Sequence, residues 1–341
     1  MEAPHVLDRL EIDSASIDAD SSYGDEMYES ETSHARTNLF RTNLLIPRSY
    51  LRSTYTKSLS ASVLAYEWIY GRRYHSYGAG TYKFPNDERE QARLDLCHDI
   101  YYLLLGQQLF LAPINPDGMR ILDIGTGIGK WPIQMGDLYP SAEVIGTDLS
   151  PIQPHLVPPN VRFIIDDVEQ QWDDNQAYDY IHCRYIAGSI RDWPALMRQC
   201  YQHLKPGGWV ELQESCIYPY SEDDSLKPGN KWVEMLELLA QACALIGRTM
   251  DPGPYLKRFV EGAGFDNVAQ HVYKLPVGSW PKDGRMKVIG SFMAMHYIDG
   301  VEGLTLRPFT ETLGWSRPDV EALNEQVRQA IRTRGVHAMH D

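Results

Sequence analysis

A glycine-rich turn follows a short apolar run near residue 120. Residues 121–129 read ILDIGTGIG, with Gly125, Gly127 and Gly129 at every second position. Glycine adopts positive φ readily and lets a ligand approach the backbone closely. The dinucleotide fingerprint GxGxxG would need a glycine at position 130, where Lys130 stands, and the phosphate-loop spacing GxxxxGK[ST] is absent. The turn therefore indicates a ligand site but disfavours NAD and FAD.

Two carboxylates follow at the ends of the next apolar runs. Asp148 stands 23 residues after Gly125, where a carboxylate can accept both hydroxyls of a ribose. Asp167 ends the run after that, where a carboxylate can accept the exocyclic amino group of adenine. Either residue alone is more often a solvated strand end or a helix cap. Together with the turn they predict an adenosine pocket at the carboxyl ends of parallel strands.

The elements that would position these residues alternate between strand-length runs and helix-length spacers. This alternation predicts an α/β fold with a doubly wound, mostly parallel sheet and right-handed crossovers. A long amphipathic helix is expected before the sheet, helices at 230–264 and 284–334 after it, and a sixth strand at 268–276. The ranges that carry the prediction are 86–112 for the first helix and 120–125, 143–148, 161–166, 178–183 and 208–214 for the strands.

Composition excludes several classes of function. The 341 residues include 46 acids and 32 bases, a net charge of −14, which argues against general affinity for nucleic acids or anionic membranes. The five cysteines form no CxxC and no Cys/His ligand spacing, so we expect no structural metal and a reducing compartment. No secretory signal and no membrane-spanning run is evident, so the expected location is the cytoplasm.

The charge is unevenly distributed along the chain. Residues 1–35 hold ten acids and one base, which predicts a disordered acidic tail. Residues 36–61 invert the sign and form a basic arm, and residues 62–341 are expected to form one globular domain. A solvated role for the arm is the simpler interpretation, and binding of a protein partner by the tail or the arm is the alternative.

Several motifs of the chain are similar to those of class I S-adenosylmethionine methyltransferases. The chain more narrowly resembles the fungal LaeA-like (TAM-domain) group of secondary metabolism, over roughly residues 70 to 340. The segments that carry the resemblance are GRRYHSYGAGTYKFPNDEREQARLDL, ILDIGTGIG, VIGTDLSPIQP, VRFIIDDVEQQW, YDYIHCRYIAGSIRDW, LKPGGWVELQE and LPVGSWPKD.

The resemblance implies a Rossmann-like sheet of seven strands, the last antiparallel, with S-adenosylmethionine as cofactor. It implies a cofactor core at about residues 119–215 and helical N-terminal and C-terminal lid additions, the latter an insert at about 282–334. The chain departs from the group at Lys130, in the arm at 36–60, and at 337–341, where relatives usually continue through a last strand. A missing or shortened edge strand would leave sheet backbone to be covered by something else.

The resemblance also assigns roles to cofactor-binding residues. The turn would hold the methionine part, Asp148 the ribose with Leu149 packing on adenine, and Asp167 with the Val168 backbone the adenine edge. Arg184 would lie near the methionine carboxylate, although a surface ion pair is the plain alternative, and Tyr74 and His75 would close over the cofactor. The turn residues with these roles are Asp123, Gly125, Thr126 and Gly127.

The sequence indicates less about the methyl acceptor than about the cofactor. The Asn-Pro-Pro-Tyr and Pro-Cys motifs of nucleic-acid methyltransferases are absent, so a small organic acceptor is favoured. Candidate bases are Glu214 and His296, and Tyr185 and Tyr297 are candidate acceptor contacts, whereas His182 is interpreted as a core residue. The methylated atom stays open.

Three functions remain open at this point. The first is a small-molecule methyltransferase that tailors a secondary metabolite. The second is a LaeA-like regulator in a nuclear protein complex, and the third is a cofactor-binding scaffold that catalyses a cyclisation without moving the methyl group.

Overall fold

The computed structural model describes residues 9–13, 52–53, 66–75, 82–172 and 177–341. Their centre is a five-stranded sheet in the order β7-β5-β4-β8-β9, in which every neighbouring pair is parallel. The predicted α/β class and parallel sheet are confirmed. The strands are β4 (Arg120–Ile124), β5 (Glu143–Asp148), β7 (Val161–Ile165), β8 (Tyr178–Arg184) and β9 (Leu204–Gln213).

The strand order reverses at β4. The chain adds β5 and β7 on one side of β4 and then returns to add β8 and β9 on the other. In open α/β sheets the crevice for a ligand lies at such a reversal, outside the carboxyl ends of the strands. The glycine-rich turn follows β4, so the topology puts the predicted adenosine pocket at this point.

Both faces of the sheet are buried, which explains the continuous apolar runs of its strands. Successive residues of a strand point to opposite faces, and Ile121 packs with Trp131 and Met135 of α3 (Lys130–Leu138). Its neighbour Leu122 packs on the other face with Trp193 and Met197 of α4 (Trp193–Gln202). Helix α6 (Leu256–Gly262) covers the same side through Val260.

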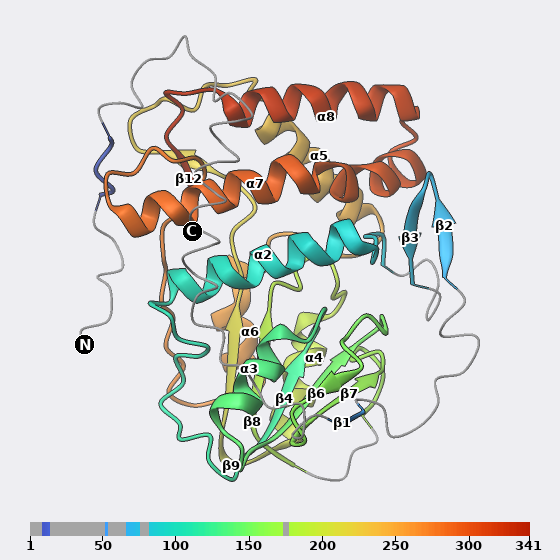
Figure 1. Ribbon diagram of the computed structural model, residues 1–341, viewed down its shortest axis with the longest axis vertical. Coiled ribbons are helices and arrows are strands. Elements are labelled where there is room, and N and C mark those ends of the chain that lie inside the picture. The colour runs from blue at the N-terminus through green and yellow to red at the C-terminus, as the bar shows by residue number, and fades with distance from the viewer. Residues whose placement is uncertain (1–8, 14–51, 54–65, 76–81, 173–176) are drawn as a thin grey trace.

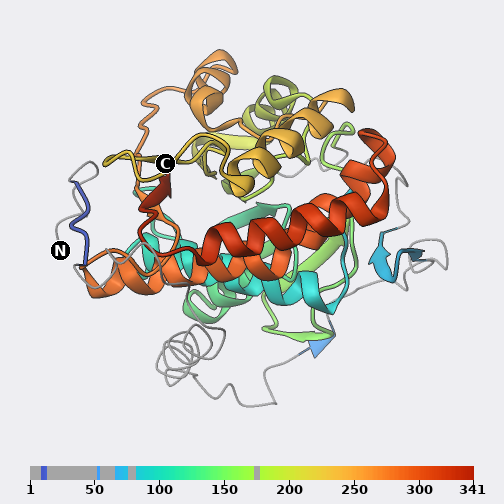
Figure 2. The ribbon, with the colours of Figure 1, turned by 90° about the horizontal axis from the view of Figure 1, so that it is seen from above.

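A layer of long helices lies beyond the carboxyl ends of the strands (Figures 1 and 2). Helix α2 is nearest to the sheet, α7 packs on α2, and α8 is outermost (Figure 1). These helices share one apolar core that includes Phe292, Val301 and Val327. The bounds of the layer are α2 Glu88–Leu104, α5 Lys231–Leu245, α7 Gly284–Arg307, the π-helical turn Pro308–Thr312 and α8 Arg317–Arg332.

Three predicted elements differ from the structure. The first helix ends at Leu104 instead of residue 112, and the helix expected over 230–264 is interrupted between α5 and the 3-10 helix Gly253–Tyr255. The sixth strand expected at 268–276 is reduced to β11 (Leu275–Pro276).

The expected seven-stranded sheet is wrong for the described residues. The last strand, β12 (Ala338–His340), does not join the parallel sheet, and instead pairs antiparallel with β10 (Tyr220–Ser221) and β11. Apolar runs alone did not distinguish the two sheets, because the partner of a strand is decided by packing. The C-terminal segment thus has strand partners of its own beside the helical layer (Figure 1).

The expected disordered tail is wrong for residues 9–13. Ile12 bridges to Pro281, and the backbone N–H of Asp13 donates to the Trp280 carbonyl at 2.8 Å. The carboxylate of Asp13 pairs with Lys287 of α7. The rest of the acidic tail lies outside the described residues, as does the basic arm except for β1 (Arg52–Ser53), which pairs with β6 (Leu156–Val157).

An antiparallel hairpin precedes α2. It consists of β2 (Glu67–Ile69) and β3 (Arg72–Tyr74). Arg72 anchors it through a buried hydrogen bond from Nε to Asp87 at 2.5 Å, and Asp87 also caps α2 by accepting from the Glu90 N–H.

In the part of the chain that the structure describes, no helix is long and apolar enough to cross a membrane.

Candidate active site

The turn after β4 requires its glycines. Gly125 has φ 68°, and a Cβ added there would lie 2.3 Å from Cγ2 of Ile186. Gly129 has φ 76°, and a Cβ there would lie 2.4 Å from Cζ of Phe163. Because of the positive φ and these short distances, any residue other than glycine at position 125 or 129 would be strained. Helix α3 begins directly after Gly129, so its first N–H groups are part of the turn.

Asp148 fixes the turn against the next strand. Its Oδ2 accepts from the Gly127 N–H at 2.8 Å and its Oδ1 from the Ser150 N–H at 2.9 Å. Burial raises the pKa of the Asp148 carboxyl, and these two backbone N–H groups oppose the rise. Each oxygen keeps a further lone pair, which fits the predicted ribose contact. The sequence did not reveal that the same carboxylate also holds the turn.

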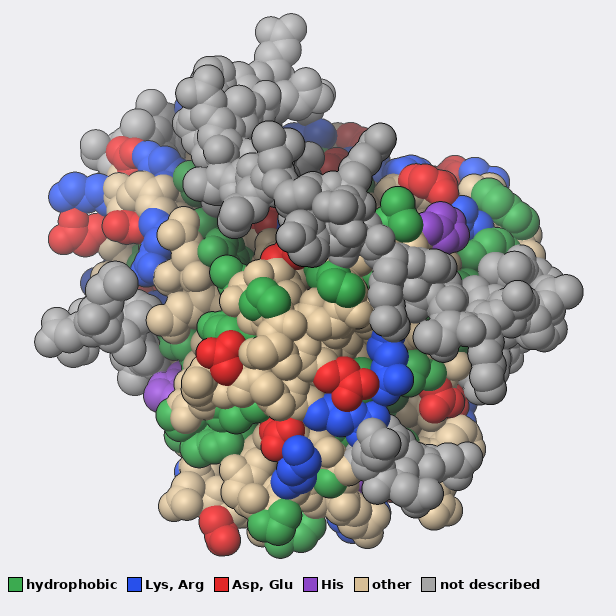
Figure 3. Space-filling model, turned by 60° about the horizontal axis from the view of Figure 1, so that its bottom comes forward, with side chains coloured by type: hydrophobic (Ala, Val, Ile, Leu, Met, Phe, Trp, Pro, Cys, Tyr) green, Lys and Arg blue, Asp and Glu red, His purple; other side chains and the backbone are tan. Residues whose placement is uncertain are grey.

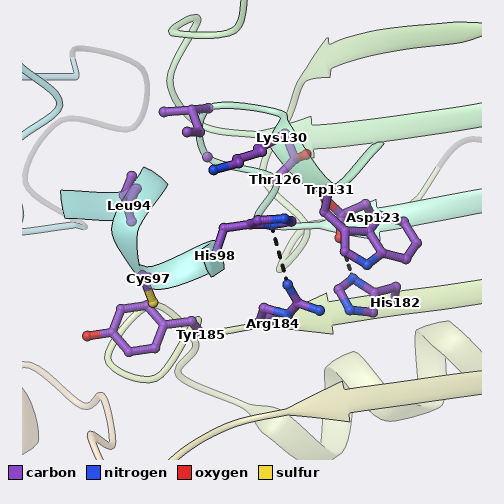
Figure 4. Close-up of a pocket in the computed structure, with 13 residues that line it drawn as sticks. Leu94, Cys97, His98, Asp123, Thr126, Lys130, Trp131, His182, Arg184 and Tyr185 are labelled. Atoms are coloured by element: carbon purple, nitrogen blue, oxygen red, sulfur yellow. Dashed lines mark hydrogen bonds and ion pairs between the residues drawn. The ribbon is translucent and has the colours of Figure 1, made fainter. Parts of the chain in front are cut away.

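A pocket of about 490 Å³, including the solvent at its mouth, opens beside the turn (Figure 4). The structure brings together there five of the predicted cofactor residues (Asp123, Gly125, Thr126, Gly127 and Arg184) and the predicted acceptor contact Tyr185. The other lining residues are Leu94, Cys97, His98, Ile128, Lys130, Trp131 and His182.

Arg184 is held in place by neutral groups. Its Nε donates to Gln213 Oε1 at 2.7 Å, its Nη2 donates to the Leu109 carbonyl at 3.0 Å, and its Nη1 lies 3.4 Å from His98 Nδ1. Burial lowers the pKa of the guanidinium, which nevertheless stays charged because arginine is not deprotonated in proteins. No carboxylate of the described residues forms an ion pair with it, so this cation suits an anionic ligand group such as a methionine carboxylate.

Helix α2 contributes one wall of the pocket, which the sequence analysis did not find. Leu94, Cys97 and His98 lie on one face of α2 and point into the pocket (Figure 4). Lys130, which the sequence showed only as a departure from the family, forms ion pairs with Asp95 and Asp99 of α2, both at 2.7 Å. The spacing of three and four residues on a helix was the available signal.

The predicted adenine contacts lie at the neighbouring strand end. The Asp166 N–H donates to the Asp148 carbonyl at 3.0 Å, which places β7 beside β5. The Asp167 carboxylate accepts from the Glu169 N–H at 3.0 Å and from Gln170 Nε2 at 3.2 Å. Leu149 and Val168 are half-buried. Leu149, Asp167 and Val168 do not line the pocket described above, nor does Asp148, and the roles of all four stay predictions.

Tyr74 and His75 are buried outside that pocket. Tyr74 lies under the Arg307 guanidinium, 4.7 Å from its ring centroid, and burial raises its pKa to about 12. The His75 ring lies 5.6 Å from that of Tyr82. Residues 76–81, which follow them, are outside the described residues, so the predicted closure over a cofactor is a proposal.

Comparisons with known proteins agree with this geometry. A family model described as "Methyltransferase domain" matches residues 96–270. The chain is 54% identical to the methyltransferase pytC of Aspergillus terreus over 285 residues, 83% of this chain and 88% of the relative. It is 35% identical to the secondary metabolism regulator LAE1 of Cochliobolus heterostrophus, over 80% of this chain and 91% of the relative.

A third relative is the protein-methionine methyltransferase laeA of Emericella nidulans, 33% identical over 79% of this chain and 72% of the relative. The chain is an S-adenosylmethionine-dependent methyltransferase. The resemblance to S-adenosylmethionine-dependent methyltransferases, the predicted enzyme class and the predicted cofactor are thereby confirmed.

A buried polar cluster lies behind Tyr185 in the methyltransferase. Tyr185 directly follows β8 with φ 56°, and its hydroxyl lies 3.0 Å from His296 Nε2 on α7. Arg93 Nη1 donates to the Tyr185 hydroxyl at 3.2 Å and lies 3.0 Å from His296 Nε2. The other edge of Arg93 forms a bidentate pair with Glu90, at 2.6 and 2.9 Å. We call Glu90, Arg93, Tyr185 and His296 the Arg93 cluster.

The predicted base His296 is poorly suited to that role. It is 1% exposed, and burial together with the charge of Arg93 holds its pKa well below the usual range. It reaches the pocket only through Tyr185. Tyr297, the adjacent predicted contact, instead lies 3.1 Å from His340 Nε2 inside the helical core. Helix α7, which belongs to the expected C-terminal lid, therefore does not line the pocket. Helix α2 lines it, and α7 lies behind α2.

Glu214, the other predicted base, holds the loop that carries Tyr185. Its Oε1 accepts from the Ile186 N–H at 2.6 Å, while its Oε2 is buried and has no hydrogen-bond partner among the described residues. Burial raises the pKa of Glu214 to about 8. The side chain does not line the pocket, so a structural role is the simpler one in this methyltransferase.

Proposed function

We propose that the methyltransferase transfers a methyl group from S-adenosylmethionine to a small-molecule acceptor, as a tailoring step in fungal secondary metabolism. The observation that carries the proposal is that five of the predicted cofactor residues and Tyr185 line one pocket. The 54% identity to the methyltransferase pytC, against 33–35% for relatives named as secondary metabolism regulators, favours an enzyme over a regulator. The face in Figure 3 shows acidic and basic side chains intermixed, without one basic patch for a nucleic acid.

The described residues fit the proposed cofactor by charge and by hydrogen-bonding capacity. Asp148 would accept from the ribose, Arg184 would hold the methionine carboxylate, and the Thr126 hydroxyl, buried without a partner, is available for a further contact. When bound, the cofactor supplies an electrophilic methyl group on a sulfonium. The protein then has to align the acceptor and exclude water. Helix α2, which Lys130 holds through its ion pairs with Asp95 and Asp99, is suited to exclude water from the pocket.

The acceptor that suits this site carries its own acidity. A neutral alcohol would need a base, and neither predicted base, His296 nor Glu214, lines the pocket. A carboxylic acid, an enol or a phenol ionises without help. Tyr185 lines the pocket, and its hydroxyl, which accepts from Arg93 and lies 3.0 Å from His296 Nε2, is our candidate contact for such an oxygen. Oxygen methylation of an acidic hydroxyl is therefore our proposal.

The experiment incubates the purified protein with methyl-labelled S-adenosylmethionine and, separately, with small acids, enols, phenols and alcohols, with pathway metabolites, and with fungal protein extract. We expect label in a small acidic product and equimolar S-adenosylhomocysteine. Label in protein would instead favour the regulatory alternative. An altered metabolite without S-adenosylhomocysteine would indicate the cyclisation scaffold. The inactive control is Asp148→Ala.

A further inference from the structure

His182 occupies a position that a plain core residue does not explain. It is on β8 opposite Asp123 of β4, is 0% exposed, and yet is one of the residues that line the pocket (Figure 4). Its Nδ1 lies 2.7 Å from Asp123 Oδ1. Trp131 stacks on the imidazole at 3.9 Å between centroids and 2° between planes, which fixes the orientation of the ring.

The contact with Asp123 determines which nitrogen carries the proton. A carboxylate only accepts hydrogen bonds, so Nδ1 must be the donor. Burial lowers the pKa of His182, although the bond to Asp123 opposes this, so the imidazole is neutral at neutral pH. Nε2 is then a lone-pair acceptor, and it is buried without a hydrogen-bond partner among the described residues. A buried acceptor without a donor is costly and needs an explanation.

The strand period places this acceptor beside Arg184. Residues 182 and 184 are two apart on β8, so their side chains point to the same face of the sheet, whereas Cys183 packs in the core of the other face. The same face thus presents an acceptor pair, Asp123 and His182, next to a guanidinium that has no carboxylate partner in the described chain. An amino acid presents the complementary pair, an ammonium next to a carboxylate.

We propose that His182 is a cofactor-binding residue. Its Nε2 accepts a hydrogen bond from the α-ammonium group of the methionine part, with Asp123 supplying the counter-charge and Arg184 facing the carboxylate. The Nδ1 bond to Asp123 keeps Nε2 unprotonated, so the two residues act as one acceptor unit. This role concerns the cofactor alone, and it stands or fails independently of the proposed acceptor.

The first test uses the unmutated protein labelled with ¹⁵N-histidine. S-adenosylhomocysteine carries the α-ammonium group, whereas 5′-methylthioadenosine has the same nucleoside without the amino acid. We expect the His182 Nε2 resonance to move toward a hydrogen-bonded shift with the first ligand and to stay in place with the second. Equal shifts with both ligands, or none with either, would show that Nε2 is only structural or bonded to water.

The second test is calorimetry with the same two ligands on matched variants. His182→Asn keeps an N–H that can donate to Asp123 but removes Nε2, and His182→Phe removes both nitrogens. We expect both to bind S-adenosylhomocysteine about 10- to 100-fold more weakly, as for a lost hydrogen bond to a charged group, with 5′-methylthioadenosine unaffected. Tyr180→Phe, which removes a buried hydroxyl from the same strand, should change neither affinity.

The Asn variant decides between two roles. If it binds S-adenosylhomocysteine as tightly as the unmutated protein, His182 only positions Asp123 and the proposal is overturned. Equal losses for both ligands in the Asn and Phe variants would also overturn it, because they would indicate general damage to the pocket. If neither variant folds, the labelled-histidine experiment still decides.

Discussion

The parallel sheet and the helical layer hold their polar groups in different ways. At the sheet, the carboxylate of Asp148 is bound by backbone N–H groups of its own strand end and of the adjacent turn. In the layer, Arg93 meets His296, 203 positions away in the chain, and Tyr185 from the sheet. The proposed cofactor half of the site is thus held by local backbone geometry, and the proposed acceptor half by long-range packing.

This difference also affects how much the free energy of unfolding should change when one side chain is substituted. Backbone N–H groups at a turn stay in place when one side chain changes. The Arg93 cluster has no such support, because each member depends on the others in a buried environment. We therefore expect substitutions in the layer to affect folding most, and substitutions at the sheet to affect binding.

The largest effect is expected for Arg93→Met. It leaves the Glu90 carboxylate, 3% exposed, without its partner, and breaking a buried ion pair costs about 3–5 kcal/mol of the free energy of unfolding. Urea denaturation measures this loss. Arg89→Met on the same helix is the control, since its side chain is 58% exposed and its pair with Glu302 is worth about 1 kcal/mol or less. Equal losses in the two variants would contradict the contrast between layer and sheet.

Asp148→Ala should weaken cofactor binding by about 1.5–3 kcal/mol for each charged hydrogen bond lost. The turn also loses the acceptor for the Gly127 N–H, so the melting temperature should fall. Calorimetry with S-adenosylhomocysteine measures the affinity. Asp166→Ala, at an exposed carboxylate on the next strand end, is the control. An unchanged affinity in a folded Asp148→Ala protein would remove this residue from the site.

Tyr185→Phe should lower turnover about tenfold while it leaves cofactor affinity nearly unchanged, because it removes one hydroxyl beside Arg93 and keeps the ring. Tyr297→Phe is the control, since its hydroxyl contacts His340 in the helical core. The measurement is kcat with an identified acceptor, together with the Kd of S-adenosylhomocysteine. If both variants lose turnover equally, the acceptor half extends further into the layer than proposed.

Glu214→Gln should change the pH dependence of stability. The native state keeps the Glu214 proton up to about pH 8, whereas the unfolded chain loses it near the ordinary value of 4.5. The stabilisation is therefore complete below that value and is lost as pH rises toward 8. The free energy of unfolding of the unmutated protein should fall more steeply over this range than that of the variant. Parallel curves would show that this carboxyl is ionised in the native state.

Removal of residues 1–13 should have the smallest effect, a fall of about 2 °C in Tm. The strand-like contacts of residues 11–13 with residues 280–282 are lost, but they lie at the edge of the layer. Differential scanning calorimetry measures the shift, and S-adenosylhomocysteine affinity should not change. A loss of cofactor affinity would connect this segment to the site, contrary to its position.

The sequence by itself determined the elements of the proposed cofactor half of this methyltransferase. The strands at 120–125, 143–148, 161–166 and 178–183, the glycine turn and Asp148 could be located, because each follows from local patterns of burial, φ and strand-end position. The start of helix α7 at residue 284 could also be expected, but neither its end nor its place behind α2.

Only the tertiary structure decided the remainder. No local pattern connects Arg93 with His296, assigns β12 to a second sheet, or turns His182 from a core residue into a pocket residue. Each of these depends on which distant surfaces pack together, and on buried polar groups whose partners come from other elements. Such contacts are chosen by the close packing of the whole chain, which spacing along the sequence does not encode.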